Sequence, residues 1–326
     1  MWQTLKSSLL KLDPETAHHT VIALLKSYQW WHFRLLKQEL GGEDLRVPGL
    51  PRLRFRSRVG LAAGFDKNAE VFAGLSRLGF GFIEVGTVTP LPQEGNPKPR
   101  IWRLRPDALV NALGFNNCGL SVFQKNLIRY RNAVSDFPLF ANIGKGKLTP
   151  NEQAIDDYRQ AFRALAHLVD GFVINVSSPN TPGLRSLQST DFLEQVAKEI
   201  PVGKPVWFKF APDLSESELL SLCEWIKREP RATGVVLTNT SRALADAQRF
   251  PLGGLSGGPL FQRALECVSL ARSVFREDKV IIGVGGVSSG EDARRMRKAG
   301  ADLIEIYTGF IYQGPDIVRE VSHALQ

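Results

Sequence analysis

The sequence predicts an α/β fold, a (β/α)8 TIM barrel with a small N-terminal helical extension, and three observations support this class. The chain has 326 residues, which suits one such barrel plus an appendage. From residue 59 onward, eight short runs rich in Val, Ile, Leu and Phe alternate with stretches of helical periodicity. No GxGxxG turn follows the first run, which argues against a doubly wound open sheet.

The eight runs are expected to be the parallel strands of the barrel, because short runs rich in apolar residues suit a sheet that is buried on both faces. In order they are 59–65, 82–89, 139–144, 171–177, 206–211, 234–240, 279–287 and 303–309. Amphipathic helices are predicted between them, for example at 151–169, 216–227 and 290–299. Two interruptions, 90–115 and 241–259, exceed the usual loop length and fall on the side where barrel enzymes place their active sites.

Residues 1–40 follow a helical pattern and are predicted to form a separate small domain before a barrel domain at 41–326. The tripeptide Asp-Pro-Glu at 13–15 starts a helix, with an N-cap carboxylate, proline at the first helical position and an acid in the first turn. Further along, Trp30 and Trp31 lie in an apolar patch beside basic residues, a combination that suits a lipid headgroup boundary. A helical pair packed on the barrel and a membrane contact both fit this segment.

The net charge of +8 is unevenly distributed, since residues 1–58 hold ten Lys or Arg against five acids. Four of these cations alternate with apolar residues, so one face of a predicted strand would carry Arg52, Arg54, Arg56 and Arg58. Because no aromatic residues interleave on that face, a solvated edge is favoured over nucleic-acid binding. The three cysteines are far apart and encode neither a disulfide framework nor a metal site, which indicates a reducing compartment. No apolar run of about 18 residues is present to span a bilayer.

Polar residues stand at the carboxyl end of nearly every predicted strand, where a barrel enzyme binds its substrate. They are Lys67, Thr87, Asn142, Asn175 with Ser178, Lys209, Thr238 with Asn239, Gly285 with Gly286, and Tyr307 with Thr308. No histidine and no carboxylate cluster lies at a strand end, so no metal site is expected and His-based acid-base chemistry is disfavoured. Amides, lysines and hydroxyls suit a flat, polar, anionic ring. The glycines after the seventh strand and the segment 307–309 match the usual phosphate site of such barrels.

Several segments together resemble the dihydroorotate dehydrogenases, and within them class 2, the membrane-associated, quinone-reducing enzymes. The matching segments are 61–68, 86–90, 94–100, 114–117, 175–188, 209–213, 253–257 and 307–312. The resemblance runs from Leu12 to the C-terminus. It implies the oxidation of (S)-dihydroorotate to orotate in de novo pyrimidine (UMP) biosynthesis, with hydride passing to FMN and electrons then to a membrane quinone.

The same resemblance implies roles for individual residues. Ser178 would be the general base, helped by Thr181 and by a water shielded by Phe115, because a serine hydroxyl needs a relay to act as a base. The substrate-binding residues would be Lys67, Asn111, Ala112, Leu113, Gly114, Phe115, Asn175, Asn180, Asn239 and Thr240. The FMN-binding residues would be Ala63, Gly64, Phe65, Asp66, Lys67, Thr87, Asn142, Asn175, Lys209, Thr238, Gly257, Gly286, Tyr307 and Thr308. Arg103 and Tyr307 would lie near the quinone.

The assignment to class 2 depends mainly on Ser178, because the soluble classes of this family have a cysteine base at that position. Class 2 implies that residues 1–40 form the mouth of a quinone tunnel. The chain would then be a monomeric peripheral protein on the cytoplasmic face of the bacterial inner membrane, with no iron-sulfur partner subunit and no nucleic-acid partner. Three positions depart from the family pattern: Ala112 replaces a common arginine, Gly146 an asparagine and Glu305 a glutamine.

Two other functions fit parts of the sequence. One is a flavin-free phosphate-binding isomerase or aldolase, in which Lys67 or Lys209 would form a Schiff base. The other is a basic peripheral membrane-binding module without turnover.

Overall fold

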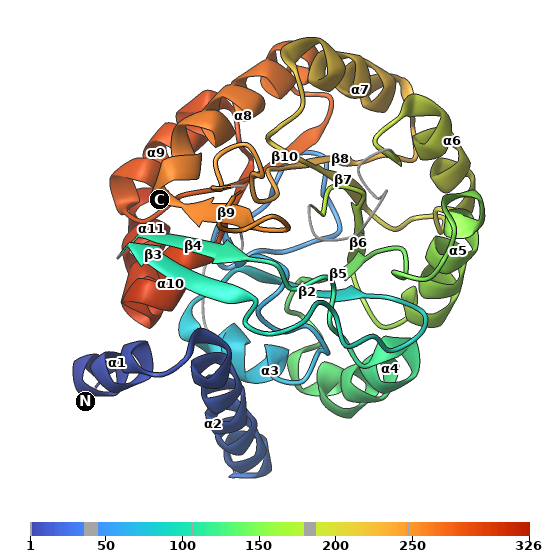
Figure 1. The fold of residues 1–326 in the computed structure, drawn as a ribbon. Helices are drawn as coiled ribbons and strands as arrows, with labels where there is room; N and C mark the ends of the chain where they lie inside the picture. Colours follow the sequence, from blue (N-terminus) through green and yellow to red (C-terminus); the bar gives the residue numbers. More distant parts are fainter. Residues whose placement is uncertain (1, 36–44, 106, 179–186, 247) are drawn as a thin grey trace.

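A closed barrel of eight parallel strands forms the centre of the computed structural model, which describes residues 2–35, 45–105, 107–178, 187–246 and 248–326 (Figure 1). The strand order around the barrel is β1-β11-β10-β8-β7-β6-β5-β2. The strands are β1 (Val59–Leu61), β2 (Phe82–Val88), β5 (Leu139–Ile143), β6 (Gly171–Asn175), β7 (Val206–Phe210), β8 (Gly234–Leu237), β10 (Val280–Val284) and β11 (Leu303–Ile306). Each lies inside one of the eight predicted runs, so the barrel prediction is confirmed.

Helices surround the barrel as an outer ring in Figure 1. They are α3 (Phe72–Leu75), α4 (Gly119–Tyr130), α5 (Ala154–Leu165), α6 (Thr190–Glu199), α7 (Glu216–Arg228), α8 (Phe261–Phe275), α9 (Gly290–Ala299), α10 (Thr308–Gln313) and α11 (Pro315–Ala324). Local signals fix their ends. Ser215 and Glu218 form a capping box at the start of α7, and Ser289 caps α9, which ends at Gly300 with φ 118°.

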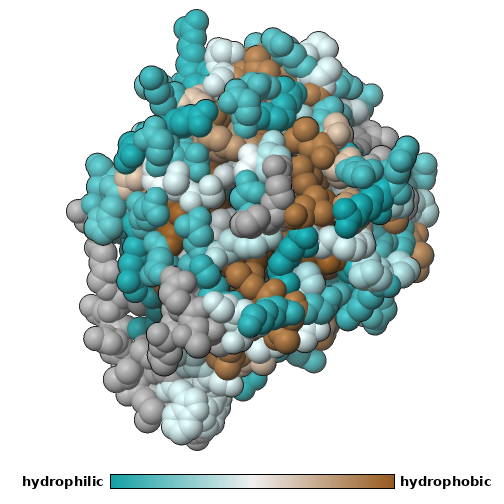
Figure 2. Space-filling model, turned by 60° about the vertical axis from the view of Figure 1, so that its left-hand side comes forward, coloured by the Kyte–Doolittle hydropathy of each residue, from teal (hydrophilic) through white to brown (hydrophobic). Residues whose placement is uncertain are grey.

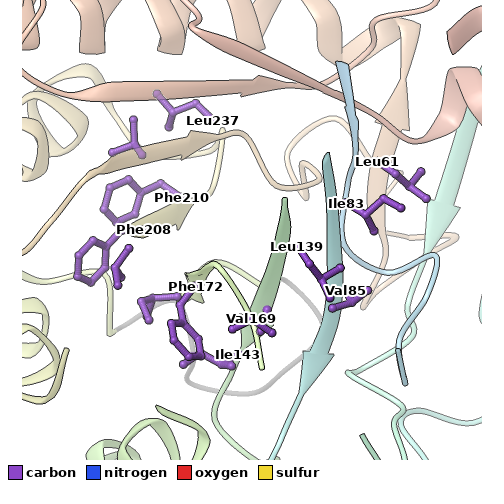
Figure 3. Close-up of a cluster of buried hydrophobic side chains, with 14 of the residues drawn as sticks. Leu61, Ile83, Val85, Leu139, Ile143, Val169, Phe172, Phe208, Phe210 and Leu237 are labelled. Carbon is purple, nitrogen blue, oxygen red and sulfur yellow. The ribbon is translucent and has the colours of Figure 1, made fainter. Parts of the chain in front are cut away.

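The core has two parts. Apolar side chains between the strands and the outer helices form the larger one, and Figure 3 shows a section of it from Leu61 to Leu237. The smaller part fills the barrel interior, where the rings of Phe140 and Trp207 lie 4.8 Å apart. Buried Phe55 joins this interior cluster, where its ring lies 6.0 Å from that of Phe82.

The prediction of a strand over the four alternating arginines at 52–58 is wrong. Residues 52–58 form only one isolated bridge, between Phe55 and Leu45, and Leu50 and Leu53 lie in successive turns. The barrel is closed, so it offers this segment no free edge to extend. The alternation instead turns Phe55 into the barrel and leaves Arg52 and Arg54 exposed.

The two long interruptions form a small sheet that the sequence pattern did not predict. Its antiparallel strands are β3 (Ile101–Arg105), β4 (Ala108–Asn111) and β9 (Gly254–Gly257). β4 pairs with β9 from the other interruption, for example Leu109 opposite Ser256. Strands of four or five residues whose partner lies far along the chain carry too little local pattern to be predicted. The sheet brings side chains from both interruptions to the carboxyl end of the barrel.

Two N-terminal helices, α1 (Trp2–Lys11) and α2 (Pro14–Leu35), project from one side of the barrel (Figure 1). Asp13 caps α2 as predicted, since its carboxylate accepts the Thr16 backbone N–H at 2.9 Å. Gln29 fixes α2 to the barrel, because its amide oxygen accepts the Gly74 N–H at 2.9 Å. Among the described residues, no helix has the length and apolar character that crossing a membrane requires.

A buried ion pair also joins α2 to the barrel. The Glu15 carboxylate accepts hydrogen bonds from the Arg100 guanidinium, the shortest at 2.6 Å, and both side chains are less than 10% exposed. We expect Glu15→Ala to lower the free energy of unfolding by about 3 kcal/mol, because it leaves the buried Arg100 charge without its partner. Glu194→Ala, which breaks the exposed pair with Lys198, should cost less than about 1 kcal/mol. Urea denaturation of both variants checks this, and equal costs would contradict it.

Candidate active site

A pocket with about 1410 Å³ of open space, part of it continuous with solvent, lies at the carboxyl ends of the barrel strands. Barrel strands, the small β3-β4-β9 sheet and helix α2 all contribute to its wall. Most of the predicted site residues line it together. They are Ala63, Gly64, Lys67, Thr87, Arg103, Asn111, Leu113, Gly114, Phe115, Asn175, Ser178, Lys209, Thr238, Asn239, Thr240, Gly257, Gly286, Tyr307 and Thr308.

Some predicted residues do not line the pocket. Phe65 is buried against His18 and Phe310, and the Ala112 backbone pairs with Arg100. The Asp66 carboxylate accepts the backbone N–H groups of Glu70 and Val71, and burial raises the pKa of this carboxyl to about 6. These three residues therefore shape the loops that carry pocket residues. Asn180 and Thr181 lie outside the described residues.

Asn142 also lies behind the wall, where it holds two residues that do line the pocket. Its side-chain oxygen accepts a hydrogen bond from the Thr87 hydroxyl at 2.5 Å and one from the Asn175 amide at 3.3 Å. Of the three positions that depart from the family pattern, only Glu305 lines the pocket. The Gly146 N–H donates to Asp157 at 2.8 Å, outside the lining.

Two asparagine amides at the strand ends share one hydrogen-bond network. The Asn175 side-chain oxygen accepts from the Ser177 hydroxyl at 3.1 Å and from the Asn239 amide at 3.4 Å. The Asn239 amide also donates to the Ser177 oxygen at 2.9 Å, and its own side-chain oxygen accepts the Thr240 N–H at 2.7 Å. These contacts fix which way each amide points, so the wall presents ordered donors and acceptors to a ligand.

Ser178 follows this network directly and is only 4% exposed, yet it lines the pocket. A hydroxyl in such a place meets a bound ligand without competing bulk water. Lys67 comes from the loop after β1, and burial lowers the pKa of its ammonium to about 8. An ammonium that has lost its hydration binds an anionic group strongly.

Glycines form a second region of the wall. Gly257 and Gly286 have φ values of 96° and 76°, which disfavour any other residue. A Cβ at Gly286 would lie 2.8 Å from the Gly257 carbonyl oxygen, so this part of the wall has no room for a side chain there. Beside them, the hydroxyls of Ser256 and Thr308 lie 2.9 Å apart. Backbone N–H groups and hydroxyls in one concave region suit a phosphate.

Buried polar groups form the floor between these two regions. The Lys209 ammonium lies 3.3 Å from Glu84, and the Thr238 hydroxyl has no hydrogen-bond partner among the described residues. A buried polar atom without a partner costs stability unless a ligand or water satisfies it. The asparagine amides, the glycine region of the wall and these buried polar groups together fit a flat, polar cofactor that ends in a phosphate, as FMN does.

The sequence pattern missed several lining residues. His18 and Pro14 reach the pocket from α2, and Ser256 reaches it from β9. Burial holds the pKa of His18 well below its ordinary value, and the neighbouring Lys67 charge adds to this, so the ring is neutral. These residues lie on elements outside the barrel strands, and helical periodicity alone does not reveal which residue of α2 turns inward.

Arg103 and Tyr307 lie in the same pocket as His18. The Arg103 guanidinium donates to the carbonyls of Leu10 and Leu12, the latter at 2.7 Å, and so connects β3 to the end of α1. The Tyr307 hydroxyl donates to the Gly64 carbonyl at 3.4 Å. The two residues predicted to contact the quinone therefore line the same pocket as His18 of α2. No cluster of three metal-ligating side chains occurs in the part of the chain that the structure describes.

Comparison with known proteins gives one consistent family. The family model described as dihydroorotate dehydrogenase matches residues 48–326. A curated relative from Christiangramia forsetii, named dihydroorotate dehydrogenase (quinone), is 40% identical over 98% of this chain and 97% of its own length. A relative of the same name from Nitratiruptor is 42% identical over 99% and 93%.

Solved structures agree with these relatives. DHODH from Eimeria tenella in complex with ferulenol has a TM-score of 0.84 and 35% identity, covering 96% of this chain and 90% of its own. The ligand-free form has the same TM-score and 36% identity, covering 96% and 94%. The chain therefore belongs to the dihydroorotate dehydrogenase family, in its quinone-dependent class.

Proposed function

We propose that this protein oxidises dihydroorotate to orotate in pyrimidine biosynthesis, with FMN as its cofactor and a membrane quinone as the final electron acceptor. Membership of the family supports the reaction. The observation that carries the proposal in the molecule itself is the position of Ser178, buried on the wall of one pocket with Lys67 and the paired asparagine amides. Ser178 supplies the hydroxyl proposed to act as the base in this part of the pocket.

Residues on two sides of the pocket would hold the substrate. The Lys67 ammonium pairs with the substrate carboxylate, since it is the cation that burial has left poorly hydrated. The amides of Asn111, Asn175 and Asn239 bind the carbonyls and N–H groups of the pyrimidine ring. Hydrogen bonds with the Ser177 hydroxyl keep the amides of Asn175 and Asn239 oriented before the substrate binds, which lowers the entropic cost of binding.

Ser178 would remove the proton from C5 of the bound substrate. Its burial excludes bulk water as the proton acceptor, so the proton must leave along a relay of neighbouring groups. Thr181 and a water beside Phe115 are the proposed members of that relay. Bound FMN supplies the acceptor for the hydride that leaves C6. Lys209 would stabilise negative charge on the ring of the cofactor, while Gly257, Gly286 and Thr308 would hold its phosphate.

The N-terminal helices would connect this pocket to a membrane. Leu24, Tyr28, Trp30 and Trp31 of α2 are each more than 40% exposed. Figure 2 brings the side of the molecule with α1 and α2 forward and shows apolar patches among polar groups on this face. We propose that the helices lie on the cytoplasmic face of the inner membrane of a bacterium, and that the quinone enters between α2, Arg103 and Tyr307. The protein would act as a monomer, without an iron-sulfur subunit.

The simplest test is the visible spectrum of the purified protein followed by a turnover assay. A yellow protein that releases FMN, and that reduces a quinone only when dihydroorotate is present, is the expected result. A colourless protein that binds no added FMN would contradict the proposal. Trapping of a carbonyl substrate on Lys67 or Lys209 by borohydride would instead identify a Schiff-base enzyme.

Lys67 should govern the pH dependence of substrate binding. With a pKa of about 8, it is charged below that pH and loses its charge above it, so KM for dihydroorotate should rise in alkaline solution. Lys67→Met should raise KM about tenfold or more at pH 7, because a charge-assisted hydrogen bond is lost. It should also abolish the alkaline rise. Steady-state kinetics from pH 6 to about 9.5 check this, with Lys26→Met on exposed α2 as control. An unchanged pH profile in Lys67→Met would contradict the assignment.

A further inference from the structure

The side chain of Glu305 is a carboxyl group on the pocket floor, and the proposed reaction assigns it no role. It lies on β11 and is fully buried, yet it lines the pocket together with Lys209. In the barrel register it stands between Gly60 of β1 and Val284 of β10, which are both uncharged. The charged groups that face it come from across the barrel interior. They are Lys209 of β7 and Glu84 of β2.

The hydrogen bonds of this cluster are distributed unequally. The Glu84 carboxylate accepts from the Asn142 amide on one oxygen, and its other oxygen lies 3.3 Å from the Lys209 ammonium. Glu305 approaches the same ammonium only to 3.9 Å. Neither oxygen of Glu305 accepts a hydrogen bond from a described donor, and its carboxyl group faces that of Glu84. Glu84 is therefore the carboxylate that the lysine and the amide stabilise.

One ammonium does not fully compensate two buried carboxylates. An unpaired buried charge is costly, and a carboxyl avoids that cost by keeping its proton. Burial and the Glu84 charge raise the pKa of Glu305 well above its ordinary value, against the opposing effect of Lys209. These surroundings favour the protonated, neutral form of Glu305. A neutral carboxyl carries an O–H group that must find an acceptor.

We propose that Glu305 is a neutral acid that donates its O–H to an acceptor atom on the polar edge of the bound flavin, beside Lys209. This inference rests on the proposed function, because it needs FMN in the pocket. The Thr238 hydroxyl on the same floor also lacks a partner among the described residues, which indicates that the ligand brings hydrogen-bonding atoms to this place. A neutral donor and a cation together stabilise the negative charge that the ring gains on reduction.

Infrared difference spectroscopy of the FMN-loaded protein, reduced electrochemically, tests this directly. We expect a carbonyl-stretch band of a protonated carboxylic acid that is absent in Glu305→Gln. The band should shift when FMN is removed and again when FMN is reduced. If no band depends on Glu305, the residue is ionised and the proposal is wrong. If the band exists but is identical with and without FMN, the proton faces Glu84 instead, which also overturns the proposal.

The redox midpoint potential at pH 7 provides a second readout with two variants. Glu305→Gln keeps a neutral donor of the same size, so its potential should stay close to that of the parent protein. Glu305→Leu removes the donor, and the preference of the pocket for reduced over oxidised FMN should fall about tenfold. A large rise of the potential in Glu305→Gln would mean that a negative charge had been removed, which contradicts a neutral Glu305.

These outcomes separate the inference from the proposed function. A protein that binds no FMN would refute the function itself. A protein whose FMN is bleached by dihydroorotate, but which lacks the Glu305 band, would refute only the role of Glu305.

Discussion

Ser178→Ala will slow flavin reduction by dihydroorotate by about 10²- to 10⁴-fold, the usual contribution of a positioned general base. The substitution removes one oxygen from a residue that is 4% exposed, so bulk water cannot easily take over as proton acceptor. Binding of FMN and reoxidation by quinone should be unchanged, because both use other parts of the pocket. Anaerobic stopped-flow absorbance with a saturating concentration of dihydroorotate measures the reduction step alone.

Ser177→Ala is the matched control, since this serine is adjacent and also buried. Its hydroxyl orients the amides of Asn175 and Asn239, so the variant should mainly raise the KM for dihydroorotate. The assignment of the base would be wrong if Ser177→Ala lost the reduction step while Ser178→Ala retained it.

Replacing both Trp30 and Trp31 by serine will sharply lower the use of a long-chain quinone in vesicles. The two rings are 44% and 60% exposed and lie 5.2 Å apart on α2. If both enter the lipid, their loss weakens membrane binding by about tenfold or more for each large apolar side chain. Flavin reduction by dihydroorotate should be unaffected, and a short water-soluble quinone should still be reduced. Point variants are preferable to deletion of the helix, because deletion would leave buried Arg100 without Glu15.

Val202→Ser is the control for exposed apolar surface, because this side chain is fully exposed on a loop between α6 and β7. It should change neither vesicle binding nor quinone use. Full activity with the long-chain quinone in the double tryptophan variant would show that α2 is not the membrane contact.

The barrel was predictable because each buried parallel strand lies in a short run that is rich in apolar residues. The runs at 82–89 and 206–211, for example, contain β2 and β7. The small sheet was not predictable, since β4 and β9 pair across more than 140 residues and neither strand exceeds four residues. The arginine pattern at 52–58 failed for a different reason. The alternation of apolar and basic residues indicates which side chains are buried. A strand must also pair with the free edge of a sheet, and a closed barrel has no free edge.

The candidate site was predictable where polar residues interrupt apolar strands, as Asn175 and Lys209 do. Their convergence follows from the closure of the barrel. The contributions of His18 and Ser256 depend on how α2 and the small sheet lie over the barrel, which no local pattern encodes. The state of Glu305 depends on Glu84 and Lys209, two residues on other strands that only the barrel brings close.

The central claim is that one pocket couples dihydroorotate oxidation to quinone reduction through FMN. Anaerobic addition of dihydroorotate to the purified protein, followed by addition of a long-chain quinone, tests it most directly. The visible flavin absorption should disappear with the first addition and return with the second. A flavin that dihydroorotate leaves oxidised, or that the quinone fails to reoxidise, would contradict the account.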